Sequence, residues 1–261
     1  MINNQNAVTK AIVTGGAQGI GFAIANQLLA EGCKSIALIG RDKTKGAAAV
    51  AKLEKYDAKV IFISADLSDE KAALNAVEQA NKTLGTSNAL VNAAATSSRA
   101  SLLETTKENF DFIFHTNVLG PMLLMQAVVK GLLAAKQAGS IVNVLSMSGH
   151  GGQPFLTPYS ASKAALAGVT KNAAFAYRQN GIRVNAVLPG WMDTEGEDAV
   201  QKKWHNAPDN WLEIAEKKAP LGQLVRPAQL AHLVAYMISP NAGVMTGALV
   251  DYDQTISGPS N

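Results

Sequence analysis

Short apolar runs alternate with longer helix-forming stretches along most of this 261-residue chain, and that alternation restricts its fold more than any other feature. The pattern predicts strands at Ala11–Thr14, Ser35–Ile39, Lys59–Ser64, Ala89–Asn92, Ser140–Leu145, Arg183–Leu188 and Leu249–Tyr252. It predicts helices at Ile20–Glu31, Lys43–Tyr56, Asp69–Thr83, Asn109–Lys136 and Pro158–Asn180. Such alternation produces parallel strands joined by right-handed helical crossovers.

Two of these strands, Ile36–Ile39 and Ile141–Leu145, are nearly continuous apolar runs, which a sheet covered on both faces requires. Apolar residues make up 48% of the chain and charged residues 16%, enough for one large core. We therefore expect an α/β fold in a single domain over residues 1–261: a Rossmann-type doubly wound parallel sheet of about seven strands with helices on both faces. The stretch 191–220 breaks the alternation, and we interpret it as a substrate lid.

Charge and cysteine content argue against several other classes of protein. The formal net charge is +3 without a run of Lys or Arg, so we expect no nucleic-acid partner. Cys33 is the one cysteine, which leaves no disulfide framework and no metal-ligand spacing. The polar N-terminal residues lack the order of a signal peptide, and polar residues or glycines interrupt the apolar stretches before the ~18 residues that a membrane span needs. We expect a cytoplasmic protein with no metal and no membrane contact.

A glycine-rich turn follows the first predicted strand and opens the first helix. Its glycines allow a tight turn and let the backbone approach a pyrophosphate, while the helix N-terminus offers free N–H groups to the phosphates. Three glycines alone are weak evidence, but their position in a strand–turn–helix unit points to dinucleotide binding. The residues expected to contact the cofactor here are Thr14, Gly15, Gln18, Gly19, Ile20 and Gly21.

The end of the second strand bears on which dinucleotide is bound. Gly40 stands where an NAD-preferring site usually has a carboxylate, and Arg41 follows with a planar guanidinium that suits a 2′-phosphate. The alternative is a surface Arg41 paired with Asp42. We favour NADP(H) over NAD(H), because no strand-end acid repels the phosphate. Asp66 and Leu67, after the third strand, are expected beside the adenine ring.

Tyr159 and Lys163 lie four residues apart, on one face of a predicted helix. Carbonyl reduction needs an acid for the developing alkoxide and the reverse reaction needs a base, and a nearby cation helps a phenol to ionise. Lys163 supplies that cation, while Ser146 at the end of the fifth strand can donate to the substrate oxygen. A YxxxK pair occurs by chance on many helices. The combination of Ser146, Tyr159 and Lys163 with an upstream dinucleotide-binding turn is a more specific signal.

These motifs resemble the short-chain dehydrogenase/reductase family, over about residues 9–253. The family's TGxxxGxG turn is matched, and Ser146, Tyr159 and Lys163 match its catalytic set. The resemblance implies that Asn117, in the long central helix, completes this set by holding a water that links Lys163 to solvent. It also implies a homotetramer, since family members often assemble in this way.

Two further segments are compared with the family pattern. The family's Asn-Asn-Ala-Gly motif is represented by Asn92-Ala93-Ala94-Ala95, which keeps only the first Asn and lacks the Gly. Residues 189–194 are similar to its PGxxxT segment, in which Thr194 and the Leu188 backbone would hold the nicotinamide carboxamide. The cofactor contacts that the resemblance adds are Asn92, Tyr159, Lys163, Pro189, Gly190, Met192 and Thr194.

The residues expected to line the substrate pocket are those just after the fifth strand, the residue after Pro189-Gly190, residues of the lid, and Arg99 from the loop after the fourth strand. Aromatic faces with neutral hydrogen-bonding groups suit a sugar or polyol, so we predict an NAD(P)-dependent oxidoreductase of that class. The alternatives are a 3-ketoacyl or other ketone reductase and a non-catalytic nucleotide-sensing protein. Some of these residues have a simpler alternative role. His150 and His205 could face solvent, and Trp204 could pack the lid without touching substrate. The expected pocket residues are Arg99, Ser148, His150, Gln153, Trp191, Trp204, His205 and Trp211.

Overall fold

All seven predicted strands form one parallel sheet in the computed structural model, which describes residues 4–256. The strands are β1 (Lys10–Thr14), β2 (Ser35–Gly40), β3 (Lys59–Ser64), β4 (Ala89–Asn92), β5 (Gly139–Val144), β6 (Ile182–Pro189) and β7 (Leu249–Tyr252). Their order in the sheet is β3-β2-β1-β4-β5-β6-β7, and every neighbouring pair is parallel. The expected doubly wound sheet is confirmed.

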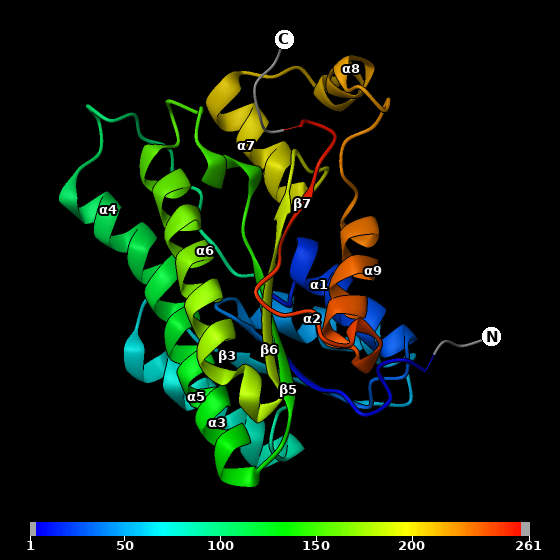
Figure 1. The fold of residues 1–261 in the computed structure, drawn as a ribbon. Coiled ribbons are helices and arrows are strands. Elements are labelled where there is room, and N and C mark those ends of the chain that lie inside the picture. Colours follow the sequence, from blue (N-terminus) through cyan, green and yellow to red (C-terminus); the bar gives the residue numbers. More distant parts are fainter. Residues whose placement is uncertain (1–3, 257–261) are drawn as a thin grey trace.

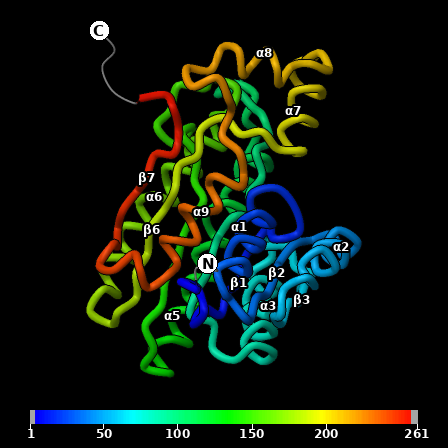
Figure 2. Tube along the Cα trace, turned by 90° about the vertical axis from the view of Figure 1, so that its right-hand side faces the viewer, coloured from blue at the N-terminus to red at the C-terminus, as the bar shows by residue number. Residues whose placement is uncertain are grey.

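Helices cover both faces of this sheet (Figures 1 and 2). They are α1 (Gly19–Ala30), α2 (Lys43–Leu53), α3 (Glu70–Leu84), α4 (Lys107–Phe114), α5 (Gly120–Ala135), α6 (Thr157–Tyr177), α7 (Glu195–His205), α8 (Trp211–Lys218) and α9 (Pro227–Ile238). A π-helical turn, η1 (His115–Leu119), joins α4 to α5, and the 3₁₀ turns are η2 (Met147–His150), η3 (Arg178–Asn180) and η4 (Pro240–Ala242).

The strands separate two hydrophobic cores. Ile12 on β1 faces the core under α3, α5 and α6, whereas Ala11 and Val13 face the core under α1, α2 and α9. This division follows from the two-residue period of a strand. Leu124 on α5 and Leu28 on α1 are fully buried, one in each core. Burial of a side chain of this size contributes roughly 1.5–3 kcal/mol to folding.

Three of the described helices were not predicted, although the sequence carries a signal for two of them. Helix α9 begins at Pro227, a residue favoured in the first helical turn, and buries Leu230 and Val234 at helical spacing. Helices α7 and α8 lie within the 191–220 segment. The Thr194 hydroxyl caps α7 by accepting from the Glu197 N–H at 3.0 Å, so Thr-x-x-Glu is the missed start signal.

The predicted long central helix runs without interruption from α4 through η1 to α5. These 29 residues include a window with a mean hydropathy of 1.7, so the expectation that no stretch reaches the length of a membrane span is wrong for this helix. Leu124, Val128 and Leu132 on it are buried in the core against the sheet, and 44% of the apolar window is buried. Length and composition alone therefore do not distinguish this core helix from a span.

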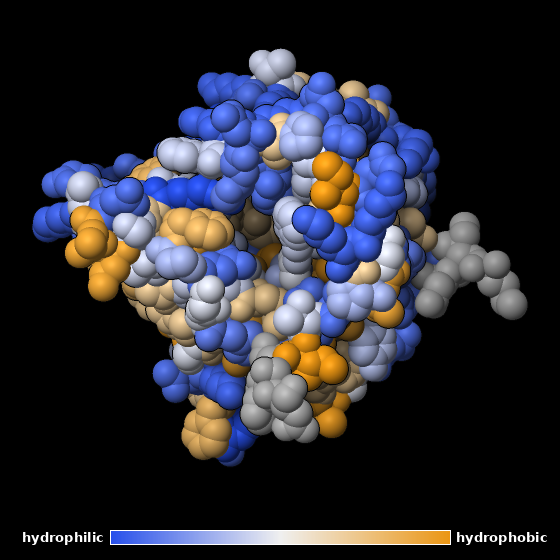
Figure 3. Space-filling model, turned by 90° about the horizontal axis from the view of Figure 1, so that it is seen from above, coloured by the Kyte–Doolittle hydropathy of each residue, from blue (hydrophilic) through white to orange (hydrophobic). Residues whose placement is uncertain are grey.

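The carboxyl ends of the strands carry the loops that matter for function. The chain leaves β1 toward one side of the sheet and β4 toward the other, and a crevice forms where the strand order reverses. Helices α7 and α8 lie over this edge at the top of Figure 1, after the end of β6. Seen from above, this face is mostly hydrophilic and hollowed near its centre (Figure 3).

Candidate active site

The turn after β1 forms one wall of a cavity of about 560 Å³ at the crevice. Gly15 has a φ of +65°, and a Cβ there would lie 3.1 Å from the Ala94 Cα. A Cβ on Gly21 would lie 2.4 Å from the Gly15 carbonyl oxygen. The glycines thus let the turn pass close to the loop after β4 and leave the N-terminus of α1 facing the cavity, which fits a pyrophosphate.

Most of the predicted cofactor residues line this cavity. Thr14 does not: its hydroxyl accepts from the N–H groups of Ala93 and Ala94, each at 3.0 Å. Asn92 is also buried away from the cavity, and its amide donates to the Asn143 side chain at 2.8 Å. Both residues therefore position the wall and do not form it. The predicted residues on the wall are Gly15, Gln18, Gly19, Ile20, Gly21, Arg41, Asp66, Leu67, Tyr159 and Thr194.

Two cations lie on the wall beyond β2. Arg41 lines the cavity, while the Asp42 carboxylate accepts from the Lys45 N–H at 3.0 Å and so caps α2. Lys45, which the sequence analysis missed, also lines the cavity and donates from Nζ to Gln18 Oε1 at 2.8 Å. Burial raises the pKa of Asp66, but hydrogen bonds from Ser68 and the Arg41 charge outweigh this and hold it below its usual value. The arrangement suits an added phosphate.

A second cavity, of about 740 Å³, extends from the end of β5 to the lid segment. Tyr159 lines both cavities and therefore lies where they meet. Pro189, Gly190 and Met192, predicted as cofactor contacts, line the second cavity. The described residues that line both cavities are Ile20, Ser97, Tyr159, Thr194 and Glu197.

Ser146, Tyr159 and Lys163 come together at the junction. The Ser146 hydroxyl lies 2.7 Å from the Ser148 hydroxyl, and Ser146 and Tyr159 both line the second cavity. Lys163 is buried behind the Tyr159 ring, with Nζ at 5.6 Å from the ring centroid, and donates to the Val144 carbonyl at 2.8 Å. Lys163 lines neither cavity.

Burial dominates the ionisation of this pair. Desolvation raises the pKa of Tyr159, the Ser146 hydrogen bond lowers it, and the Glu197 charge raises it further, with a net upward shift. Burial also lowers the pKa of Lys163 to about 8. From the sequence, the Lys163 cation is predicted to help the phenol ionise. In the folded protein, loss of water around both groups is the larger effect.

Asn117 lies in the π-helical turn η1 and ties the loop after β4 to α6. Its Oδ1 accepts from the Thr96 N–H, and its amide donates to the Thr96 carbonyl, both at 2.9 Å. The same amide donates to the Ser162 hydroxyl at 3.0 Å, which in turn donates to the Tyr159 carbonyl at 2.7 Å. These contacts fix the position of Tyr159. The implied water-holding role of Asn117 stays a prediction.

The predicted substrate residues divide into two groups. Arg99, Ser148, Gln153, Trp191 and His205 line the second cavity. His150 does not, because its Nε2 pairs with Asp251 at 3.0 Å on the exposed side.

The other two predicted tryptophans also lie away from the cavity. Trp204 is 53% exposed and stacks with the Lys203 side chain. Trp211 is buried within the lid segment, donates to Asp198 at 2.7 Å, and supports Trp191 from behind with ring centroids 5.9 Å apart. Of the three lid tryptophans, Trp191 is the one that reaches the cavity.

Two features of the cavity were not predicted. Arg99 and His205 contact each other at 2.9 Å, and both pack against the Phe155 ring, so the loop after β4 meets α7 at this point. Glu197 accepts from the Trp191 indole N–H at 2.9 Å and places a carboxylate near Tyr159. The Thr-x-x-Glu cap could have indicated Glu197.

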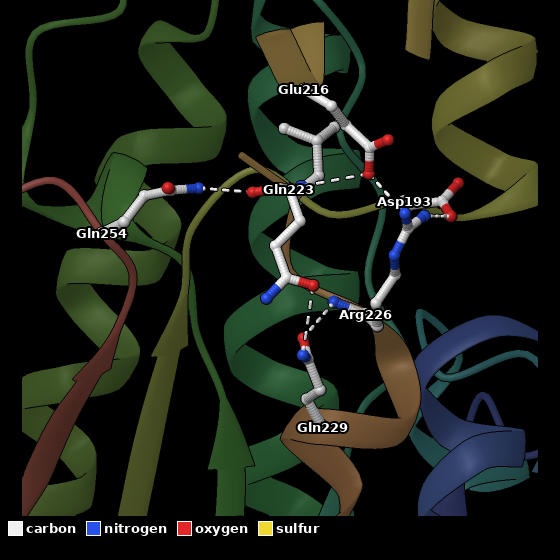
Figure 4. Close-up of polar contacts among 7 residues, drawn as sticks. Asp193, Glu216, Gln223, Arg226, Gln229 and Gln254 are labelled. Carbon is white, nitrogen blue, oxygen red and sulfur yellow. Dashed lines mark hydrogen bonds and ion pairs between the residues drawn. The ribbon is translucent and has the colours of Figure 1, made fainter. Parts of the chain in front are cut away.

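The lid segment is fastened at its base (Figure 4). The Arg226 guanidinium donates to Asp193, within the PGxxxT segment, and to Glu216 on α8. The backbone of Val225 pairs with Trp191 and Asp193 through two hydrogen bonds, at 2.9 and 3.0 Å. The two ends of the segment therefore lie side by side.

The chain is similar to known proteins over nearly its whole length. A family model described as Enoyl-(Acyl carrier protein) reductase matches residues 15–255. Galactitol 2-dehydrogenase from Agrobacterium fabrum is 34% identical over 254 residues, covering 93% of this chain and 95% of its own.

Two solved structures have the same fold. L-sorbose reductase from Gluconobacter frateurii, complexed with NADPH and L-sorbose, superposes with a TM-score of 0.87 at 26% identity, covering 95% of this chain and 97% of its own. A variant of actinorhodin polyketide ketoreductase with NADPH also has a TM-score of 0.87, at 28% identity, with 95% and 96% covered.

Proposed function

This chain belongs to the short-chain dehydrogenase/reductase family and is an NAD(P)-dependent oxidoreductase that acts on CH–OH groups, and we propose that its substrate is a sugar or polyol. One observation carries the proposal: the second cavity joins the Trp191 indole to a set of hydrogen-bonding groups that includes Gln153 and Glu197, directly beside Tyr159. The CH face of a sugar stacks on an aromatic ring, while its hydroxyls need such partners. The similarity to galactitol 2-dehydrogenase and L-sorbose reductase supports the same class.

The proposed mechanism uses Tyr159 as the acid in reduction. A bound nicotinamide supplies the hydride to the carbonyl carbon, or takes it from the carbinol carbon in the reverse direction. The Tyr159 O–H gives its proton to the developing alkoxide, and the Ser146 hydroxyl donates a hydrogen bond that holds the same oxygen. The raised pKa of Tyr159 keeps the phenol protonated at neutral pH, which suits reduction. In oxidation the Lys163 ammonium stabilises the phenolate.

We propose NADP(H) as the preferred cofactor. Arg41 and Lys45 both line the first cavity beyond β2, and the strand ends in Gly40 without a carboxylate. Two cations at this position favour an added 2′-phosphate. The NADPH in both similar structures supports this choice.

We propose a homotetramer in the cytoplasm as the working form. The support is the family resemblance, together with an exposed strip of small residues on α6 that includes Ala164 and Gly168. The Leu-rich part of α5 is used within the chain instead, because Leu123 and Leu124 are buried against the sheet.

Nicotinamide absorbance tests the function directly. The protein is assayed with NAD⁺ and NADP⁺ against aldoses, polyols and hydroxysteroids, and with the reduced forms against ketoses and 3-ketoacyl thioesters. We expect the fastest turnover on a sugar or polyol with the NADP(H) pair. Turnover on 3-ketoacyl thioesters with none on sugars would replace the proposal with the ketone-reductase alternative. Tight cofactor binding without any turnover would favour the nucleotide-sensing alternative.

A further inference from the structure

Glu197 has a fixed position at the junction of the two cavities. It lies in the first turn of α7, where its N–H donates to the Thr194 hydroxyl at 3.0 Å. Its Oε1 accepts from the Trp191 indole N–H at 2.9 Å and from the Gln201 amide at 2.7 Å. A cap at the backbone and two donors at the side chain hold one rotamer, so the carboxylate is preorganised.

The second carboxylate oxygen of Glu197 is available to a ligand. Oε2 has no hydrogen-bond partner within residues 4–256, while Oε1 is occupied by two donors. The side chain is half-buried and lines both cavities, as Tyr159 does. A partly buried carboxylate oxygen gains most from a hydroxyl or N–H donor, because hydrogen bonds to an ionised acceptor are the stronger ones.

Glu197 and Ser146 lie on different elements and are placed to contact different groups of the substrate. Ser146, which lines the second cavity together with Tyr159, follows the end of β5, where the reacting oxygen is expected. Glu197 approaches Tyr159 from the lid, on a different element. We propose that Glu197 accepts a hydrogen bond from a hydroxyl on the carbon next to the reacting one, which makes the enzyme selective for vicinal diols and α-hydroxy ketones. This inference deepens the proposed function and rests on it.

The charges around the cavity favour a neutral hydroxyl as that donor. Arg99 and Lys218 also line the second cavity and discourage a cationic substrate. A carboxylate on the carbon next to the reacting one would face Glu197 and be repelled. The group that Glu197 selects is therefore an uncharged hydroxyl.

Two pairs of four-carbon probes isolate the effect of one hydroxyl. Acetoin and 2-butanone are compared in reduction with NADPH, and 2,3-butanediol and 2-butanol are compared as competitive inhibitors of the best ketone substrate found. The variants are Glu197→Gln, which keeps the shape and loses the charge, and Glu197→Leu, which loses the acceptor. Asp198→Asn is the matched control, since Asp198 lies next in α7 and holds Trp211 without lining a cavity.

We expect the wild type to favour the hydroxylated member of each pair. Glu197→Gln should lower that preference about tenfold and Glu197→Leu by more, because a hydrogen bond to a charged group is lost. Asp198→Asn should leave the ratio unchanged even if it loosens the lid segment. NADPH binding, followed by nicotinamide fluorescence, shows that each variant is folded.

An unchanged ratio in both Glu197 variants that still bind NADPH would overturn the inference. If either fails to bind NADPH, the inhibition ratio of the other decides. The outcome is separate from that of the proposed function. If the enzyme turns over sugars but the preference for the hydroxylated probes is unchanged in the Glu197 variants, only the role of Glu197 is contradicted. If that preference changes but no sugar or polyol is turned over, only the proposed substrate class is contradicted.

Discussion

At the scale of single residues, Tyr159 and Lys163 on α6 set the chemistry. They are four residues apart on one helix, with Lys163 buried and Tyr159 half-buried where the two cavities meet. Burial shifts their pKa values in opposite directions, so each favours its neutral form. The spacing of these residues could be predicted from the sequence. Their desolvation could not, because it depends on how closely β5 and α6 pack.

Replacement of Tyr159 by Phe should reduce turnover at least about a thousandfold, since the group that transfers its proton to the reacting oxygen is lost. Cofactor binding should change little, because the ring remains in place. Steady-state assays and nicotinamide fluorescence measure the two quantities. Near-normal turnover would mean that another group exchanges the proton.

Lys163→Met should alter how stability depends on pH. The pKa of Lys163 is about 8 when folded and near 10.5 when unfolded, so the unfolded wild type binds more protons between these values and its free energy of unfolding rises with pH. The stability of Lys163→Met relative to wild type should therefore fall by up to about 3 kcal/mol from pH 8 toward pH 10.5. Urea unfolding at several pH values measures this, and a constant difference would show that Lys163 is well solvated.

Arg41 and Lys45 should act together on cofactor choice. Arg41→Ala and Lys45→Ala should each weaken NADP(H) by about tenfold or more and NAD(H) far less, because only the former carries the 2′-phosphate. Titration of nicotinamide fluorescence gives both dissociation constants. Lys43→Ala, at the exposed start of α2 and outside the cavity, is the control. Equal losses for both cofactors would show that the cations do not contact the phosphate.

At the scale of elements, the apolar pattern predicted the strands well, but the starts of some helices are marked only by capping residues. The predicted strands are confirmed within a residue or two, because apolar runs of this length in a covered sheet are hard to mistake. Helices α7 and α8 were missed, since their outer faces are charged and their buried faces are short. The misplacement of Trp204 as a pocket residue has the same origin, whereas His150, at the end of η2, is turned outward by its pair with Asp251. Which side of a lid helix faces inward depends on contacts such as Trp211 with Asp198.

The ion pairs of Arg226 should decide how firmly the lid segment is held. Arg226→Ala removes partners from Asp193 and Glu216, which lie on the two sides of the segment's base. We expect a several-fold rise in substrate KM and faster limited proteolysis within α7 and α8. Lys217→Ala removes an exposed pair with Glu213 on α8 and should have no such effect. An equal change in both variants would show that the ion pairs of Arg226 do not hold the lid segment more firmly than an exposed pair does.

At the scale of the whole molecule, the fold class, the family and the type of reaction were all predicted from the sequence and are confirmed. The reason is physical: the order of strands and helices fixes the crevice, and the glycine turn and Tyr–Lys spacing then fall on its rim. The substrate is harder to predict, because the second cavity draws residues from five separate parts of the chain.

Assembly can be tested at this scale as well. We expect light scattering after gel filtration to give four times the mass of the 27.3 kDa chain at micromolar concentration. Gly168→Arg would place a large charged group on the exposed strip of α6, where a Cβ at residue 168 meets no atom within 4 Å in the protomer. The measured mass of the Gly168→Arg assembly should fall below that of the tetramer, while each protomer stays folded. A monomeric wild type would contradict the tetramer.

The closure of the lid segment at its base has a consequence for how such enzymes diversify. Trp191 and Asp193 are joined to Val225, so the chain leaves the sheet and returns to nearly the same point. A segment with adjacent ends can be lengthened, shortened or exchanged for that of a relative without rethreading the strands. Evolution, or an engineer, can thus exchange α7 and α8, which carry much of substrate recognition, and leave in place the residues through Thr194 that are predicted to hold the cofactor, together with Ser146, Tyr159 and Lys163.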